Sequence, residues 1–336
     1  MANLLLEYIW LDGYETSNLR SKVKVHNFTE DRALTAEDCP DWNFDGSSTQ
    51  QAPGHSSECV LKPVRTYEWA ENHFLVLCEV LNGDMTPHSS NYRAELRKHE
   101  AAFDPAKYWW GFEQEYFITK DFVPLGFPKG GYPKPQGLYY CGVGGNQVRG
   151  RKLVEKHLLK CLEMGIQLTG TNAEVAVGQW EFQCFGDDTL KACDDLWVSR
   201  YVLYRLAEEY KADVNLSPKP VHGDWNGSGC HTNFSNENMR TKGGKEYFEK
   251  IFASFAERHD HHIINYGENN ELRLTGLHET QHIGTFSWGV GDRGASIRVP
   301  NAVEKDGWVG YLEDRRPASN CDPYRVATVI VEAIEA

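Results

Sequence analysis

The chain has 336 residues, of which 40% are hydrophobic and 25% are charged, the ordinary balance of a soluble globular protein. Its formal net charge of −13 makes it a poor partner for nucleic acid or for an anionic membrane surface, so neither is expected as a binding partner. No run of apolar residues approaches the length that spans a bilayer.

The cysteines and the start of the chain bear on its compartment. Nine cysteines are scattered without a C-x-x-C pair, which is typical of free thiols in a reducing environment. The opening residues, MANLLLEYIWLDGYE, lack the basic segment and the apolar run of a signal peptide. A cytoplasmic location is therefore expected.

The first part of the chain predicts short strands separated by turns. Three strands are expected, over residues 4–10, 21–25 and 74–80. The polar, Ser- and Gly-rich stretch 41–57 predicts a loop. We place a domain boundary after Thr86, which gives an expected N-terminal domain of residues 1–86 and a second domain of residues 87–336.

The second part of the chain mixes helical and strand patterns. Asn91 is the expected cap of a helix that runs to about Phe103, and residues 108–117 (YWWGFEQEYF) have strand composition. Residues 121–147 are rich in Gly and Pro and predict a long ordered loop. Further helices are expected over residues 149–164, 192–211, 244–262 and from Pro323, capped by Asp322, to the end. The pattern predicts the α+β class, with a small β-rich domain before a larger one.

Several common nucleotide-binding and hydrolytic motifs are missing from the sequence. It contains no G-x-x-x-x-G-K-[ST] and no G-x-S-x-G, and GVGGNQ at residues 142–147 does not fit G-x-G-x-x-G. A P-loop kinase and an α/β-hydrolase are therefore not expected.

Paired glutamates on expected strands indicate a cation site. Glu113 and Glu115 alternate in GFEQEYF and so share one face of a strand. Two adjacent anions among aromatic residues repel one another and lose hydration, a cost that a cation removes, although an exposed acidic strand face is an equally open interpretation. Glu174 and Glu181 lie in the similarly apolar GTNAEVAVGQWEFQ, where partnered acids are the alternative. Together the four would supply the oxygen ligands that Mg²⁺ or Mn²⁺ prefers.

One histidine and a cluster of arginines complete the candidate site. His231, in NGSGCHTNFS, is by itself more typical of a structural histidine, but its imidazole would suit Mn²⁺ beside carboxylates. Five arginines gather near the C-terminus, with two acids beside them: Arg273, Arg293, Arg298, Arg315, Arg316, Glu279 and Glu313. The planar guanidinium matches carboxylate and phosphate, and a basic cluster in an acidic chain favours an anion site over a solvated surface. The set predicts metal-assisted phosphoryl transfer to an acid.

Eight segments resemble, in order, the signature blocks of type II glutamine synthetases. They fall within residues 42–324 and read WNFDGSSTQQAPG, GFEQEYF, PQGLYYCGVG, GTNAEVAVGQWEFQ, NGSGCHTNFS, RLTGLHET, DRGASIR and EDRRPASNCDPY. The resemblance implies a β-grasp-like N-terminal domain and a larger catalytic domain of antiparallel strands flanked by helices. It also implies a homo-oligomer of two stacked five-membered rings with active sites between subunits.

The resemblance further implies roles for individual residues. The metal beside glutamate would be bound by Glu115, Glu174 and Glu181, and the metal beside the nucleotide by Glu113, His231 and Glu313. Glutamate would be bound by Trp225, Asn226, Gly227, Arg273 and Arg315. ATP and its transferring phosphoryl group would be bound by Asn233, Ser235, Arg293 and Arg298. The ammonium pocket would contain Asp45, Ser48, Tyr140 and Glu279, with Asp45 supplied by the adjacent subunit. Taken alone, Asp45 before Gly46 is more typical of an Asx-turn.

The implied reaction is the ATP-dependent ligation of ammonia to the γ-carboxylate of L-glutamate through γ-glutamyl phosphate. It gives L-glutamine, ADP and phosphate and uses two or more Mg²⁺ or Mn²⁺ ions per site, with Asp45 and Glu279 accepting the protons of ammonium and Arg293 offsetting charge. The chain departs from the family pattern at residues 184–186 (CFG), at Asp224 where Asn is common, and at NAVEKDGWVG before LEDRR. A γ-glutamyl ligase for another amine and a non-catalytic relative stay open as alternatives.

Overall fold

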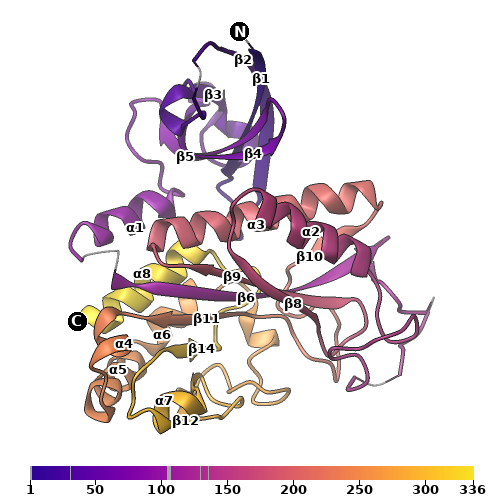
Figure 1. The fold of residues 1–336 in the computed structure, drawn as a ribbon, viewed down its shortest axis with the longest axis vertical. Coiled ribbons are helices and arrows are strands. Elements are labelled where there is room, and N and C mark those ends of the chain that lie inside the picture. Colours follow the sequence, from indigo (N-terminus) through magenta and orange to yellow (C-terminus); the bar gives the residue numbers. More distant parts are fainter. Residues whose placement is uncertain (1, 31, 104–106, 129, 135) are drawn as a thin grey trace. The chain divides into compact units, whose positions relative to one another are not determined.

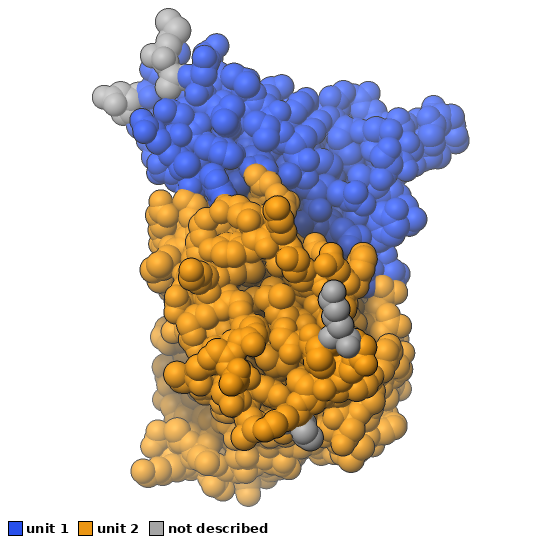
Figure 2. All heavy atoms as spheres, turned by 90° about the vertical axis from the view of Figure 1, so that its right-hand side faces the viewer, with its two compact units in different colours: residues 1–102 blue, residues 103–336 orange. Residues whose placement is uncertain are grey.

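A computed structural model describes residues 2–30, 32–103, 107–128, 130–134 and 136–336. The chain divides into two compact units, residues 1–102 and residues 103–336, which Figure 2 draws in blue and orange. Each unit contains its own mixed β-sheet. Within the described ranges no helix is both long enough and apolar enough to cross a membrane.

The first unit is built on a five-stranded sheet in the order β2-β1-β5-β4-β3 (Figure 1). Its strands are β1 (Ala2–Leu11), β2 (Leu19–Phe28), β3 (Trp42–Asp45), β4 (Glu58–Ala70) and β5 (His73–Asn82). Strands β1 and β5 are parallel, and the other neighbours are antiparallel. The three strands expected from the sequence are thus confirmed as β1, β2 and β5.

Two features of this sheet differ from the expectation. The stretch 41–57, expected as a loop, contains strand β3 and two short 3₁₀ helices, Gly46–Thr49 and Gly54–Ser56. Strand β4 was not expected, because Pro63 interrupts its strand pattern. The structure accommodates this proline at a register shift between Pro63 and Arg65.

Alternation along β1 builds the core of the first unit. Leu4, Leu6, Tyr8 and Trp10 are all buried and pack with residues of β4 and β5. Helix α1 (Tyr92–Glu100) follows the sheet, and the Asn91 side chain accepts a hydrogen bond from the Ala94 backbone amide at 3.0 Å, which confirms the expected cap.

The second unit contains a nine-stranded sheet among its described residues. The main path runs β12-β13-β14-β11-β6-β9-β8, and β10 and β7 also pair with β6. The strands are β6 (Trp109–Lys120), β7 (Val123–Pro124), β8 (Leu168–Ala173), β9 (Gln179–Gly186), β10 (Asp213–Asn215), β11 (Cys230–Ser235), β12 (Trp288–Val290), β13 (Ile297–Val299) and β14 (Leu312–Asp314). The strand expected over residues 108–117 is β6, at the centre of this sheet. Apart from the stretch that forms β7, the Gly- and Pro-rich segment 121–147 has no helix or strand in its described part; Lys129 and Pro135 lie outside the described residues.

Helices pack around this sheet in the second unit. They are α2 (Arg151–Glu163), α3 (Thr189–Glu209), α4 (Glu237–Thr241), α5 (Lys245–Glu257), α6 (His259–Asn265), α7 (Asn301–Lys305) and α8 (Pro323–Glu335). Helix α3 packs on β6 and β9, and α2 packs on α3 and β8 (Figure 1). The single helix expected over residues 244–262 was wrong, because the backbone leaves the helical conformation at Arg258 and begins again as α6. The Asp322 cap and Pro323 start of α8 are confirmed.

Strand β6 uses its two faces for different purposes. On one face Gln114 accepts a hydrogen bond from Arg200 of α3 at 2.7 Å, and the Trp110 indole donates to Thr189 at 3.0 Å. Because side chains alternate along a strand, Glu113 and Glu115 point to the opposite face. The helix-covered side of the sheet therefore fixes where these carboxylates lie.

A buried ion pair between Asp314 and Arg316 fixes the end of strand β14. The Arg316 guanidinium, 1% exposed, donates to the Asp314 carboxylate at 2.9 and 2.7 Å. It also lies 3.1 Å from Nδ1 of His259 and 2.8 Å from Nδ1 of His262 on α6. Burial and the Arg316 charge lower the pKa of His262 to about 3, so this imidazole stays neutral at physiological pH.

We expect Arg316→Met to lower the free energy of unfolding by about 3–5 kcal/mol, because Asp314 is left buried without its cation. Urea denaturation followed by circular dichroism measures the change. The matched control is Lys250→Met, whose side chain is 73% exposed in a surface pair and whose loss should change stability by about 1 kcal/mol or less. Equal losses in the two variants would contradict a structural role for the Asp314–Arg316 pair.

Candidate active site

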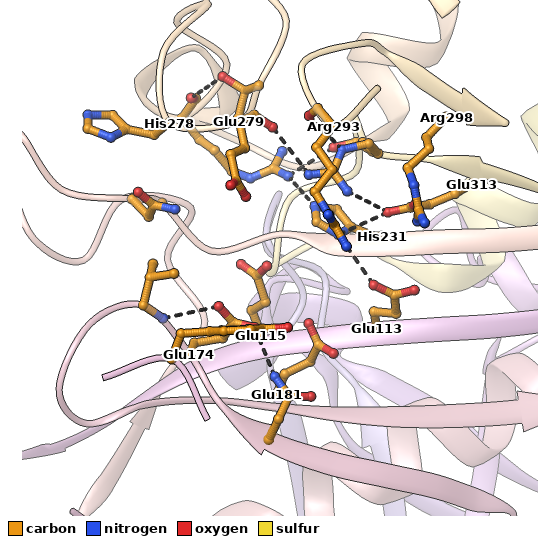
Figure 3. A pocket seen from close by; sticks show the side chains of 18 of the residues that line it. Glu113, Glu115, Glu174, Glu181, His231, His278, Glu279, Arg293, Arg298 and Glu313 are labelled. Atoms are coloured by element: carbon orange, nitrogen blue, oxygen red, sulfur yellow. Dashed lines mark hydrogen bonds and ion pairs between the residues drawn. The ribbon is translucent and has the colours of Figure 1, made fainter. Parts of the chain in front are cut away.

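One pocket of the second unit, with a volume of about 440 Å³, gathers most of the residues singled out by the sequence. Figure 3 shows Glu113, Glu115, Glu174 and Glu181 on one side of the pocket and Glu279, Arg293, Arg298 and Glu313 on the other. The sequence-predicted residues that line it are Glu113, Glu115, Tyr140, Glu174, Glu181, Asn226, Gly227, His231, Arg273, Glu279, Arg293, Arg298, Glu313 and Arg315.

The register of the sheet creates this concentration of charge. Glu115 on β6 lies directly opposite Glu181 on β9. His231 on β11 lies opposite Glu113, and Arg298 on β13 lies opposite Glu313 on β14. Residues opposite one another in a ladder have neighbouring side chains, and like charges in such positions destabilise the sheet. The Glu115–Glu181 pair therefore opposes the pairing of β6 with β9, whereas the Arg298–Glu313 pair favours the pairing of β13 with β14.

The first cluster consists of Glu115, Glu174 and Glu181, each of which offers a carboxylate oxygen within 4.8 Å of the others. Burial and the neighbouring carboxylates raise the pKa of Glu174 to about 8 and of Glu181 to about 9. Burial also raises the pKa of Glu115 to about 7, although the Arg273 charge opposes this shift. Without an added cation, these three groups would resist ionising together at neutral pH.

Glu174 corrects one expectation, since it lies in the turn between β8 and β9 and not on a strand. Its carboxylate accepts hydrogen bonds from Asn172 at 3.0 Å and from the Val175 backbone amide at 3.1 Å. The turn therefore aims Glu174 at the two strand glutamates.

The second cluster consists of Glu113, His231 and Glu313. His231 Nδ1 lies 3.5 Å from an oxygen of each carboxylate. Burial, with Arg315 and Arg273 nearby, lowers the pKa of His231 well below its usual value, so its imidazole is neutral, as a metal ligand must be.

Arginines offset the negative charge of the second cluster more than that of the first cluster. Glu313 accepts hydrogen bonds from Arg315 at 2.6 Å and from Arg298. Arg315 also donates to the backbone carbonyls of Arg293 at 2.9 Å and Glu279 at 3.2 Å, so it links several walls of the pocket. The three-carboxylate cluster thus has less positive charge beside it than the second cluster has.

Arg273 forms part of the buried wall. It is 5% exposed and donates to the Arg315 carbonyl at 2.9 Å and the Arg316 carbonyl at 3.3 Å. Its NH2 group lies 3.0 Å from His231 Nε2. Burial lowers the pKa of Arg273 to about 10, which still leaves it charged at neutral pH.

The loop that carries Asn226 and Gly227 borders the pocket. A Cβ atom at Gly227 would lie 2.4 Å from the Pro218 carbonyl oxygen, so this position requires glycine. Trp225 does not line the pocket; its indole packs on Phe127 and Tyr132 with ring centroids 5.5 and 6.3 Å away. Its predicted role in glutamate binding stays a prediction.

Sequence analysis missed several residues that line the pocket, namely Asn172, Val175, Gln183, His278 and Thr280. Gln183 follows Glu181 by two positions on β9 and donates to Asn172 at 2.8 Å. Its spacing was a usable signal, because residues i and i+2 of a strand share a face. His278 and Thr280 flank Glu279 and gave no such periodic signal.

A second pocket of about 290 Å³ adjoins the first, since Glu113 and Gln183 line both. The predicted nucleotide residues Asn233 and Ser235 lie here and not in the larger pocket. Its lining includes the aromatic residues Trp109, Phe185 and Tyr311, and it also includes Trp110, Phe112 and Phe234, whose side chains are almost fully buried. Apolar walls beside a charged pocket suit a ligand with a flat ring and an anionic tail.

Asp45 and Ser48 belong to the first unit. The Asp45 carboxylate accepts hydrogen bonds from the Ser47 amide at 3.0 Å, the Ser47 hydroxyl at 2.6 Å and the Ser48 hydroxyl at 3.0 Å. The Asx-turn interpretation is thus confirmed, and these bonds lower the pKa of Asp45. The part of Asp45 in ammonium binding stays a prediction.

Comparison with known proteins gives the chain its family. The family described as "Glutamine synthetase, catalytic domain" matches residues 90–250. A glutamine synthetase of Bradyrhizobium diazoefficiens is 54% identical over 343 residues, which cover 100% of this chain and 97% of that protein. Those of Streptomyces viridochromogenes and Yarrowia lipolytica are 50% and 48% identical, over 97% and 98% of this chain and 95% and 90% of their own lengths. The chain belongs to the glutamine synthetase family.

This family uses ATP and divalent metal, and the residues present fit such ions. The first cluster offers three carboxylates whose mutual repulsion a cation would relieve, and the second offers two carboxylates and a neutral imidazole. Oxygen-rich donor sets of this kind favour hard cations over soft ones.

We expect Glu181→Gln to have opposite effects on stability with and without divalent cations. Removing one of three crowded carboxylates should raise the melting temperature of the cation-free protein. The same change should weaken Mg²⁺- or Mn²⁺-induced stabilisation by roughly tenfold or more in apparent affinity, or about 1.4 kcal/mol.

Differential scanning fluorimetry of chelator-treated protein, titrated with each cation, measures both effects. Glu304→Gln on the exposed side of α7 is the matched control and should leave the titration unchanged. A wild-type cation response in Glu181→Gln would show that the three carboxylates do not form the cation site.

Proposed function

We propose that the chain catalyses the ATP-dependent synthesis of L-glutamine from L-glutamate and ammonia, as a glutamine synthetase of type II. The observation that carries this proposal is that two carboxylate clusters and several arginines meet in one pocket, which adjoins a second pocket with aromatic residues in its lining. Family membership and the match over the whole chain support it. Mg²⁺ or Mn²⁺, two or more per site, are the ions that suit these ligands.

The larger pocket would hold glutamate and the phosphates, and the aromatic pocket would hold adenine. Asn226 and Gly227 would contact the glutamate backbone, with Arg273 and Arg315 supplying charge for its carboxylates. Asn233 and Ser235 would contact the nucleoside. The Phe185 ring, which meets Trp109 edge-on with centroids 6.0 Å apart, gives this chain an apolar wall where the family pattern has Gly-Pro.

In the first step the γ-carboxylate of glutamate attacks the γ-phosphorus of ATP, and ADP leaves. When bound, divalent cations supply positive charge beside the phosphate oxygens. Arg293 and Arg298 would add charge-assisted hydrogen bonds to the transferring group. Because the Arg298 guanidinium is already paired with Glu313 before reaction, it would stabilise the developing charge with little reorganisation.

In the second step ammonia attacks the acyl carbon of γ-glutamyl phosphate, and phosphate leaves. Asp45 would take the first proton from ammonium, and its depressed pKa keeps it ionised for binding the cation. Glu279 would accept the remaining proton and keep water from the acyl phosphate. Tyr140 and Ser48 would complete the ammonium site.

We further propose that Asp45 comes from a neighbouring subunit of a homo-oligomer of two stacked five-membered rings. The five-stranded sheet supports a β-grasp-like N-terminal domain over residues 1–86, ahead of a catalytic domain over residues 87–336. A cytoplasmic location fits nine cysteines that are all free thiols.

The assay that tests the function compares ADP release and product formation with ammonia, with methylamine and with no amine. We expect glutamine to form only with ammonia, ATP and a divalent cation together. A higher kcat/KM with methylamine would identify a γ-glutamyl ligase for another amine. Absence of ADP release under all conditions would favour a non-catalytic relative.

We expect Asp45→Asn to impair only the second step. Asparagine keeps the turn but removes the charge and the base, so the KM for ammonia should rise by roughly tenfold or more while ATP and glutamate still bind. The intermediate should still form and appear as pyroglutamate with ADP release, measured by chromatography. Unchanged ammonia saturation would remove Asp45 from the ammonium site.

A further inference from the structure

Four residues from three separate segments are linked by hydrogen bonds and one ion pair at the rim of the larger pocket. Gln136 comes from the Gly- and Pro-rich segment, Asp224 and Asn226 from the loop before β11, and His278 from the loop before β12. His278 Nε2 lies 3.0 Å from Asp224 Oδ1, and its Nδ1 lies 3.5 Å from Gln136 Nε2. The Gln136 amide in turn bonds to Asn226. We call these four residues the rim clasp.

The hydrogen bonds of Gln136 set the orientation of the clasp. Its Oε1 accepts from the Asn226 backbone amide at 2.9 Å, and its Nε2 donates to the Asn226 side-chain oxygen. The Gln136 NH2 group therefore faces His278 Nδ1, which can only accept from it. A neutral imidazole then carries its hydrogen on Nε2 and donates it to Asp224. Each member thus fixes the donor or acceptor role of the next.

The clasp contacts a strained part of the backbone. His278 and Glu279 have φ values of +54° and +59°, two consecutive residues in the left-handed region that side chains disfavour. The Glu279 carbonyl is held by Arg315 at 3.2 Å, and the Thr280 hydroxyl donates to the Arg273 carbonyl at 3.2 Å. The His278 imidazole anchors the same turn to the loop that carries Asn226. Glu279 is therefore held from both sides.

We propose that His278 is a positioning residue that, through Asp224 and Gln136, holds Glu279 in place so that ammonia and not water reaches the activated γ-carboxyl. This inference rests on the proposed function, since it concerns the second step of that reaction. Asp224 is one of this chain's departures from the family pattern, and its carboxylate gives the imidazole a charged acceptor. The Asp224 side chain is 96% exposed and that of His278 19%, so neither supports the protein core.

The test is the ratio of glutamine formed to ADP released, with the KM values for ammonia and ATP, in His278→Ala and Asp224→Ala. We expect each variant to lower the ratio by about twofold or more and to raise the KM for ammonia by roughly fivefold, with the KM for ATP within about twofold of wild type. Asp224→Asn should restore most of the ratio, because its amide oxygen still accepts from His278 Nε2.

His282→Ala is the matched control, an exposed histidine of the same loop that bonds only within its own turn in the contacts seen here, and it should behave as wild type. An unchanged ratio and ammonia KM in both His278→Ala and Asp224→Ala would overturn the inference while leaving glutamine synthesis intact. A fall in kcat alone, equal in His278→Ala and His282→Ala, would also overturn it. A wild-type protein that makes no glutamine would overturn the proposed function and this inference together.

Discussion

Three glutamates that share one buried patch of a β-sheet are the constraint on which the rest of the active site depends. Glu115 and Glu181 are forced together by strand pairing, and a hydrogen-bonded turn adds Glu174. Burial and mutual repulsion raise the pKa values of all three, so the fold must offset an unfavourable charge. The interlocked hydrogen bonds on the far side of the sheet, such as Gln114 with Arg200, supply the rigidity that keeps such groups from moving apart.

Strand alternation separates stability from chemistry across the same few residues. Along β14 and the residue pair after it, Asp314 and Arg316 form a buried ion pair on one side while Glu313 and Arg315 line the pocket on the other. Residues adjacent in sequence should accordingly differ in phenotype, with the rear pair affecting unfolding and the front pair affecting substrate binding.

Sequence patterns predicted the features that depend on interactions between residues close together along the chain. The period of two placed Glu113 and Glu115 on one face, and the Asn91 and Asp322 caps were visible because capping involves neighbours along the chain. Strand β4 was not predicted because Pro63 interrupts its strand pattern. The end of a helix at Arg258 was not predicted because no Gly or Pro lies there. The rim clasp could not be found from sequence, since it joins Gln136 to His278 across 142 positions by contacts that have no period. The roles of the individual arginines came from family resemblance and not from spacing.

The two carboxylate clusters differ in how much of their negative charge is offset by nearby arginines, and this difference affects substrate binding. The Glu313 carboxylate accepts hydrogen bonds from the guanidinium groups of Arg298 and Arg315, as a substrate carboxylate or phosphate would. These two cations are therefore already oriented before a ligand binds. Orientation of this kind reduces the entropy lost on binding and the reorganisation needed during reaction. In the three-carboxylate cluster, the charges of Arg273 and Arg315 act on Glu115, but the Arg273 guanidinium is itself hydrogen-bonded to backbone carbonyls. The three-carboxylate end of the pocket is therefore the end that needs an added cation, whereas the end at Glu313 already holds oriented arginines.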